Sequence, residues 1–197
     1  MKKDIILAGV GGQGILSIAA IIGYAAIESG LFLKQAEVHG MSQRGGDVQS
    51  HLRLSAEPIA SDLIPYGKAD LIISVEPMES LRYLPYLGAK GWLVTSTKPF
   101  VNIPNYPDTD LLLATIKGLP RSVALDAEDM AAAAGTVKAA NMVILGAALP
   151  FLGFPVEKMK NAIQAVFGKK GEETVKINIA ALLAGLNFSN QTLNQHI

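Results

Sequence analysis

The sequence predicts an α/β fold, with a doubly wound, mostly parallel sheet followed by a C-terminal helical cluster. Two observations indicate this class: apolar runs of strand length alternate with helical segments up to residue 125, and a glycine-rich turn joins the first run to the first helix. This order of elements is typical of Rossmann-like domains. With 197 residues, 50% of them hydrophobic, the chain can bury one sizeable core.

The domain organisation follows from the same patterns. We expect a single domain over residues 1–186, with the helical cluster starting at about residue 138. Residues 187–197 are expected to form a flexible or partner-bound tail. No internal repeat or low-complexity segment suggests a second domain.

A glycine-rich turn organises the start of the chain. The run Ile5-Ile6-Leu7-Ala8 predicts a buried strand, and the apolar segment 15–29 predicts a helix that is covered on most sides. The glycines between them have G-x-G-x-x-G spacing, which permits a tight turn and close approach of a ligand to the backbone. Amide groups of the first helical turn lack intrahelical partners, so an anionic phosphate would be favoured there.

The residues predicted to bind a cofactor are therefore those of the turn: Gly9, Gly11, Gly12, Gln13 and Gly14. A purely structural alternative stands beside this hypothesis. In that alternative the glycines only let the chain turn sharply and let the helix pack closely on the strand.

Further patterns extend the alternation. Residues 31–38 predict a second strand, which would complete a strand–helix–strand unit with a right-handed crossover. Residues 39–46 show neither the helical spacing of apolar residues nor the alternation of a strand, and they predict a loop. Residues 48–54 alternate in the manner of a half-exposed strand. The remaining predicted strands are 70–75, 92–95 and 122–125, and the remaining predicted helices are 76–87, 109–116, 126–134, 138–152, 156–167 and 171–185.

The loop 39–46 is a candidate functional surface, because we expect it beside the glycine turn at the carboxyl edge of the sheet. Arg44 carries a planar fork that can bind a carboxylate or phosphate through two hydrogen bonds. The alternative is a polar hairpin or crossover loop, in which Arg44 pairs with Glu37 or Glu76. The residues predicted to face a partner or an active site are His39, Ser42, Gln43, Arg44, Gly45 and Gly46.

Composition excludes several function classes. Seventeen basic side chains balance seventeen acidic ones, so no overall field attracts nucleic acid. The absence of cysteine excludes a disulfide, a thiol nucleophile and thiolate ligands for iron–sulfur clusters. The three histidines lack metal-ligand spacing, and hydrolase motifs are absent. We therefore expect no metal site in this chain.

The apolar stretches 15–27 and 142–152 are too short to span a membrane. The N-terminus also differs from a signal peptide, because its apolar run is short and enters a glycine turn. We expect a cytoplasmic protein without a membrane partner. Only 17% of residues are charged, which favours packing against partner proteins.

Acidic residues leave two alternatives open. Glu37 lies where a dinucleotide-binding domain places the acid that binds a ribose, so this chain could bind NAD or FAD. The simpler interpretation is that Glu37 is a solvated carboxylate at the end of a strand. Glu76 and Glu79 suggest a paired-carboxylate site, but acids in the first turn of a helix explain them more simply.

Two blocks of sequence together carry a resemblance to a known family. They are Gly9-Val10-Gly11-Gly12-Gln13-Gly14 and Ala36-Glu37-Val38-His39-Gly40-Met41-Ser42-Gln43-Arg44-Gly45-Gly46, the second followed by a strand with Ser50 and Arg53. From about residue 3 to about residue 185 the chain resembles the gamma-type domain of the thiamine-diphosphate-dependent 2-oxoacid:acceptor (ferredoxin) oxidoreductases. Its second block is most similar to the indolepyruvate branch, since other branches commonly have a Tyr-Gly-Pro-Glu-like loop.

The resemblance implies a complex that decarboxylates a 2-oxoacid oxidatively, makes an acyl-coenzyme A and passes electrons to ferredoxin. It implies that thiamine diphosphate, magnesium, iron–sulfur clusters and coenzyme A belong in or with partner chains. It also implies that this chain is an accessory subunit, which has no complete catalytic site and is inactive alone. The implied partners are the thiamine-diphosphate-binding and iron–sulfur subunits, and the isolated chain could form a homodimer. The alternatives are a free-standing NAD- or FAD-binding oxidoreductase and a coenzyme A or nucleotide-binding scaffold.

Overall fold

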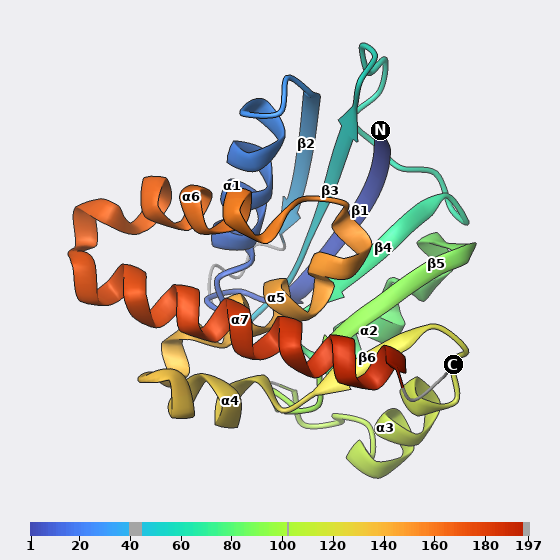
Figure 1. Cartoon of the computed structure of the whole chain (residues 1–197). Coiled ribbons are helices and arrows are strands. Elements are labelled where there is room, and N and C mark those ends of the chain that lie inside the picture. Colours follow the sequence, from blue (N-terminus) through green and yellow to red (C-terminus); the bar gives the residue numbers. More distant parts are fainter. Residues whose placement is uncertain (40–44, 102, 195–197) are drawn as a thin grey trace.

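The computed structural model describes residues 1–39, 45–101 and 103–194, except for the side chain of His39. Figure 1 shows one twisted sheet with helices on both faces. The strands are β1 (Lys2–Val10), β2 (Phe32–His39), β3 (Asp47–Ser55), β4 (Ala69–Ser74), β5 (Leu87–Ser96) and β6 (Ser122–Leu125). The helices are α1 (Ile15–Ile27), α2 (Pro77–Arg82), α3 (Thr109–Lys117), α4 (Ala127–Ala134), α5 (Ala140–Leu152), α6 (Val156–Phe167) and α7 (Glu172–Asn194), and short 3-10 turns are η1 (Leu84–Tyr86), η2 (Val137–Ala139) and η3 (Gly168–Lys170).

The strand order β2-β3-β1-β4-β5-β6 confirms a mostly parallel sheet with one exception. β1, β4, β5 and β6 are parallel neighbours, whereas β3 runs antiparallel to both β1 and β2. The predicted strand–helix–strand unit β1–α1–β2 is present, since β2 runs parallel to β1, but β3 lies between the two strands. The strands β2 and β3, which follow one another in sequence, form an antiparallel hairpin, and β3 pairs with β1 through its other edge.

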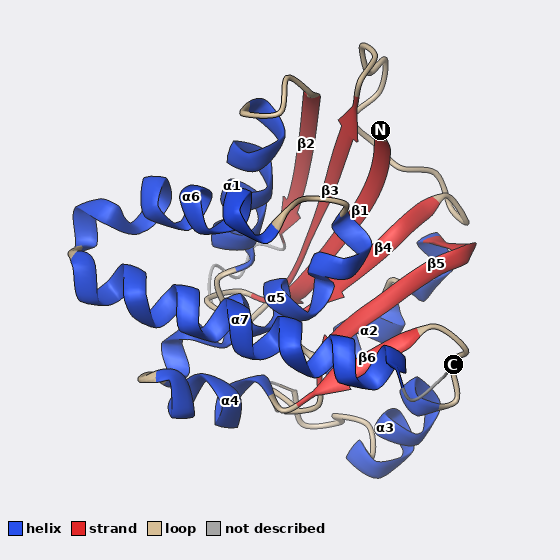
Figure 2. Cartoon of the chain, viewed as in Figure 1, coloured by secondary structure: helices blue, strands red, loops and turns tan. Residues whose placement is uncertain are grey.

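The two faces of the sheet are covered by different helices (Figure 2). Alternate residues of β1 point to opposite faces: Ile5 and Leu7 belong to the core beneath α1, α5, α6 and α7, while Ile6 and Ala8 belong to a smaller core on the other face. A strand covered on both faces reads as a continuous apolar run, as the first strand does.

Strand β3 is buried on both faces, which differs from the prediction of a half-exposed strand. Ser50, Leu52 and Leu54 are buried on the α1 face as the alternation predicts. In a half-exposed strand His51, on the opposite face, would face solvent, yet it is only 2% exposed. The cause is the segment between β3 and β4, whose residue Ile64 donates its backbone N–H to His51 Nδ1 over 3.0 Å.

The largest differences between predicted and observed element boundaries are at three places. Helix α2 ends at Arg82 rather than near residue 87, because the chain tightens into the 3-10 turn η1, which carries a proline at its start. Strand β5 consequently begins at Leu87 instead of Trp92. Helix α7 continues to Asn194, past the predicted end at 185, and Ser189 is fully buried within that extension.

The C-terminal helices pack as a cluster on one face of the sheet. Gly146 of α5 and Gly185 of α7 bring these two backbones together, since a Cβ on either glycine would overlap a carbonyl oxygen of the other helix. Trp92 of β5 stacks on Phe151 of α5 with ring centroids 4.3 Å apart, which ties the cluster to the sheet. Over the described part of the chain, none of the helices has the length and apolarity that crossing a bilayer requires.

Candidate functional site

The glycine turn owes much of its sequence to packing. A Cβ on Gly9 would overlap Val75 and lie 2.9 Å from Ile15 Cδ1, so only glycine allows the strand to approach α1 this closely. Gly14 is the N-cap of α1 with a φ of 81°, a left-handed conformation, and a Cβ there would overlap the side chain of Asn141. These contacts support the structural interpretation of both glycines.

Gln13 also has an internal role. Its side-chain Oε1 accepts a hydrogen bond from the Val10 N–H at 2.8 Å, and its own N–H donates to the Val10 carbonyl oxygen at 3.1 Å. Gly12, by contrast, has a φ of 102° and nothing within 4 Å of where a Cβ would lie. Within the turn, Gly12 is thus the position most open to a ligand.

The described end of the loop 39–46 lies against this turn, where the sequence predicts it. The Gly11 N–H donates to the Gly46 carbonyl oxygen over 2.8 Å, and the Gly45 N–H lies 3.5 Å from the Gly11 carbonyl oxygen. The other predicted loop residues, Ser42, Gln43 and Arg44, lie outside the described residues, as does the side chain of His39.

A cleft of about 800 Å³ opens beside the turn at the carboxyl edge of the sheet. Its walls come from the glycine turn, from the ends of β4 and β5, and from α4, η2, α5 and α7. The residues that line it include Gly12, Gln13, Gly14, Ser17, Val75, Ser96, Glu128, Lys138, Asn141, Ile144, Phe167, Lys170, Thr174 and Asn178. Clefts at this edge of an open α/β sheet are the usual place for ligands.

Charge in the cleft favours an anionic group at the start of α1. Gly14 provides no side-chain cap and the first turn contains no acidic residue, so the positive end of the helix dipole is not compensated there. Lys138 and Lys170 add two positive charges to the lining, against the carboxylate of Glu128. This combination is suited to phosphate.

Asn141 is a site residue that the sequence analysis did not single out. It is 7% exposed and lines the cleft, and its Nδ2 donates to the Gly14 carbonyl oxygen over 3.1 Å. Among the described residues, its Oδ1 is one of two buried side-chain polar atoms without a hydrogen-bond partner. No pattern in the sequence distinguishes Asn141 from other polar residues in helices, because its role depends on contact with a turn distant in sequence.

The acidic alternatives are resolved by the packing. Glu76 is the N-cap of α2 and accepts hydrogen bonds from the N–H groups of Glu79 at 2.8 Å and Phe100 at 3.2 Å, and from the hydroxyl of Tyr106. Glu79 lies in the first turn of that helix, where it forms an ion pair with Arg82 at 2.8 Å. Burial raises the pKa of the Glu79 carboxyl. Both acids thus stabilise the helix, as the simpler interpretation states.

The position of Glu37 weakens the dinucleotide hypothesis. Glu37 lies opposite Ser50 of β3, and β3 separates it from β1 and the glycine turn. A ribose-binding acid lies instead on the strand next to the turn. The inserted strand adds about 5 Å of separation.

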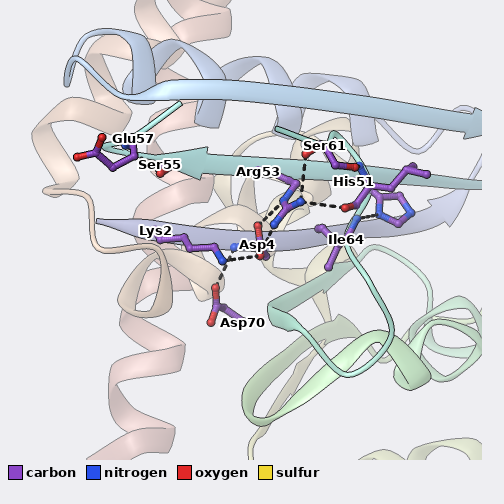
Figure 3. Close-up of polar contacts among 10 residues, drawn as sticks. Lys2, Asp4, His51, Arg53, Ser55, Glu57, Ser61, Ile64 and Asp70 are labelled. Atoms are coloured by element: carbon purple, nitrogen blue, oxygen red, sulfur yellow. Dashed lines mark hydrogen bonds and ion pairs between the residues drawn. The ribbon is translucent and has the colours of Figure 1, made fainter. Parts of the chain in front are cut away.

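Ser50 and Arg53, which follow the second sequence block, have structural partners. The Ser50 hydroxyl accepts a hydrogen bond from Gln35 Nε2 at 3.1 Å. Figure 3 shows Arg53 facing Asp4 on β1, with Nε to Oδ1 at 2.7 Å and Nη2 to Oδ2 at 3.0 Å. Arg53 Nη1 also donates to the carbonyl oxygens of Ser61 and Leu63. This network anchors the segment before β4 near the start of β1, at the opposite end of that strand from the glycine turn.

Within the ranges that the structure describes, no group of three or more His, Cys, Asp or Glu side chains could hold a metal ion. The site is thus a cleft built from backbone amides, two lysines and a buried asparagine. Such a site can bind and orient an anionic molecule.

The fold and this cleft define an α/β domain with its candidate ligand site at a glycine turn. The sequence profile described as pyruvate ferredoxin/flavodoxin oxidoreductase matches residues 4–188, and the chain belongs to this family. It is 35% identical over 204 residues to the indolepyruvate oxidoreductase subunit IorB of Thermococcus kodakarensis, a match that covers 98% of this chain and 99% of that protein.

Solved structures confirm the fold. The pyruvate oxidoreductase subunit PORC of Thermotoga maritima superposes with a TM-score of 0.73 at 21% identity, over 94% of this chain and 96% of that one. The 2-oxoglutarate:ferredoxin oxidoreductase of Magnetococcus marinus gives a TM-score of 0.75 at 21% identity, over 96% of this chain but only 31% of that one. The same domain therefore occurs both as a separate chain and as part of a longer one.

Proposed function

We propose that this chain is the gamma-type subunit of a 2-oxoacid:ferredoxin oxidoreductase complex of the indolepyruvate type. The observation that carries the proposal is the match to an indolepyruvate oxidoreductase subunit along nearly the whole length of both chains. The complex would decarboxylate a 2-oxoacid such as an arylpyruvate, form an acyl-coenzyme A and reduce ferredoxin.

The chain's own residues support a non-catalytic role in that complex. It has no cysteine, so its residues do not fit the thiolate ligation of an iron–sulfur cluster. We assign the clusters, thiamine diphosphate and magnesium to partner subunits in the cytoplasm. Consistent with this, Glu76 caps helix α2 and Glu79 pairs with Arg82 within it.

The test is purification at native level from the source organism. The expected result is co-purification with a thiamine-diphosphate-dependent, iron–sulfur partner, and loss of 2-oxoacid oxidation when the gene is deleted. Recovery as a lone monomer, with 2-oxoacid oxidation unchanged by the deletion, would refute the proposal. Assaying the complex with indolepyruvate, pyruvate and 2-oxoglutarate identifies the substrate.

The cleft favours a second, compatible role: binding a phosphate-bearing ligand such as coenzyme A or a nucleotide. Its support is the uncompensated N-terminus of α1 together with Lys138, Lys170 and the unpaired Oδ1 of Asn141. In this proposal the phosphate lies at Gly12, and the Asn141 oxygen accepts a hydrogen bond from a hydroxyl or amide of the ligand.

Calorimetry with coenzyme A, NAD, NADP and FAD separates the alternatives. Coenzyme A binding that Lys170→Ala weakens about tenfold, with Lys117→Ala on α3 as the control, would support the cleft. Tight NAD binding abolished by Glu37→Ala would favour the free-standing dinucleotide enzyme instead. Absence of binding to all four compounds would contradict both ligand hypotheses.

A further inference from the structure

The start of strand β3 sets where the loop 39–46 meets the glycine turn. Asp47, the first residue of β3, lies opposite Val10, the last residue of β1. The preceding residue, Gly46, accepts the hydrogen bond from Gly11. A shift of Asp47 would therefore move Gly46 relative to the turn and change this hydrogen bond.

Tyr83 forms a hydrogen bond with Asp47 on the face of the sheet that carries the smaller core. The Tyr83 hydroxyl donates to Asp47 Oδ2 over 2.9 Å, across a separation of 36 residues. Tyr83 is 8% exposed and packs in the smaller core with Ile64. Burial and the hydrogen bond to Asp47 raise the pKa of Tyr83 well above its usual value, so the phenol keeps the proton that it donates.

The backbone position of Tyr83 is itself fixed by helix α2. Tyr83 is the C-cap of α2, and its N–H donates to the Glu79 carbonyl oxygen. At the other end of the helix, Glu76 accepts hydrogen bonds from the backbone of Phe100 and the side chain of Tyr106. The segment after β5, helix α2, the start of β3 and the glycine turn thus form one continuous network of contacts.

We infer that Tyr83 and Asp47 form a latch that fixes Gly45 and Gly46 against the glycine turn. Tyr83 is then a positioning residue for the site at the turn, acting through Asp47 without touching a ligand. Its effect on turnover rests on the proposed function, whereas its effect on the geometry of the turn does not. The competing explanation is that Tyr83 only fills the smaller core.

Hydrogen exchange measured on the assembled complex tests the latch directly. Tyr83→Phe keeps the ring but removes the donor, and Asp47→Ala removes the acceptor, so the Gly11 amide should exchange about 2- to 10-fold faster in both variants. Asp47→Asn retains an acceptor oxygen and should exchange at nearly the wild-type rate. Tyr24→Phe, on the outer face of α1, is the matched control and should change nothing.

Turnover of the same complexes separates positioning from packing. The latch predicts a several-fold lower kcat/KM for Tyr83→Phe and Asp47→Ala at equal subunit occupancy, with recovery in Asp47→Asn. Unchanged exchange at Gly11 overturns the latch, and faster exchange with unchanged kcat/KM overturns the positioning role. If the wild-type complex oxidises no 2-oxoacid, the proposed function fails while the exchange measurement still decides the latch.

Discussion

The side-chain amide of Asn141 donates a hydrogen bond to the carbonyl oxygen of Gly14 over 3.1 Å, joining segments 127 residues apart. Gly14 ends the glycine turn, and Asn141 lies in the first turn of α5. This bond connects the two halves of the chain within the lining of the cleft. Because it is buried, its loss should be measurable.

Replacement of Asn141 by alanine should lower the free energy of unfolding by about 0.5–1.5 kcal/mol, because one hydrogen bond to the Gly14 carbonyl oxygen is lost while the N–H groups of Ser17 and Ile18 still donate to that oxygen. Urea denaturation measures the change. Asn161→Ala, an exposed position on α6, is the control and should lie within about 0.5 kcal/mol of wild type. Equal stability of the Asn141 variant and wild type would show that this bond contributes nothing net.

Replacement of Gly146 by alanine should destabilise the chain by about 3 kcal/mol or more, since the added Cβ would overlap the Leu182 carbonyl oxygen and push α5 from α7. Thermal unfolding followed by circular dichroism provides the measurement. Gly118→Ala, at the end of α3, meets its nearest atom at 3.4 Å and should be nearly neutral. A neutral Gly146→Ala would contradict the close α5–α7 contact.

The two cations beside Asp4 should differ in their importance. Arg53 pairs with Asp4 through two hydrogen bonds and its side chain is 14% exposed, whereas Lys2 lies 3.7 Å away and is 68% exposed. Arg53→Met should cost about 3 kcal/mol because the buried Asp4 carboxylate then keeps only the exposed Lys2 as its cationic partner. Lys2→Met should cost less than about 1 kcal/mol. Urea denaturation measures both losses of unfolding free energy. Similar losses for the two variants would show that burial does not determine how much each cation contributes to stability.

Stability should fall as the pH is lowered through the titration of His51. Burial, reinforced by the charge of Arg53, lowers the pKa of His51 below 6.5. Below about pH 6.5 the unfolded chain therefore binds more protons at this residue than the folded chain does, and protonation favours unfolding. The loss continues until the pH reaches the folded-state pKa.

His51→Asn isolates this effect, because asparagine can still accept the hydrogen bond from Ile64 but does not titrate. The difference in unfolding free energy between the variant and wild type should be constant from pH 7 to 8 and should shift in favour of the variant below pH 6.5. A constant difference from pH 5 to 8 would mean that His51 is protonated equally in both states.

Arg44→Lys should reduce turnover of the complex about tenfold or more while leaving the melting temperature nearly unchanged. Lysine keeps the charge but loses the planar fork that binds a carboxylate or phosphate through two hydrogen bonds. Arg121→Lys is the control, since Arg121 is exposed and its Nη1 donates a hydrogen bond to the Ala89 carbonyl oxygen at 3.1 Å. A lower melting temperature with intact turnover per folded subunit would assign Arg44 a structural role and end the functional hypothesis for the loop.

The sequence by itself determined the class of fold, the glycine turn and the end of the loop that lies beside it. These features depend on local rules: apolar runs of strand length, helix caps such as Asp108 and Asp126, and the spacing of glycines. The interpretation of Glu76 and Glu79 as acids at the start of a helix was correct because it also rests on a local rule. The positive end of the helix dipole favours acidic residues wherever the helix packs.

Only the tertiary structure decided what depends on contacts between distant segments. The insertion of β3 between β1 and β2, which separates Glu37 from the turn, is a choice of strand order that hydrophobic periodicity does not encode. Burial of His51 results from the segment that crosses it, and the roles of Asn141 and Tyr83 result from partners 127 and 36 residues away. A buried polar side chain needs a hydrogen-bond partner, and the fold, not the local sequence, decides which side chains are buried and which partners lie near them.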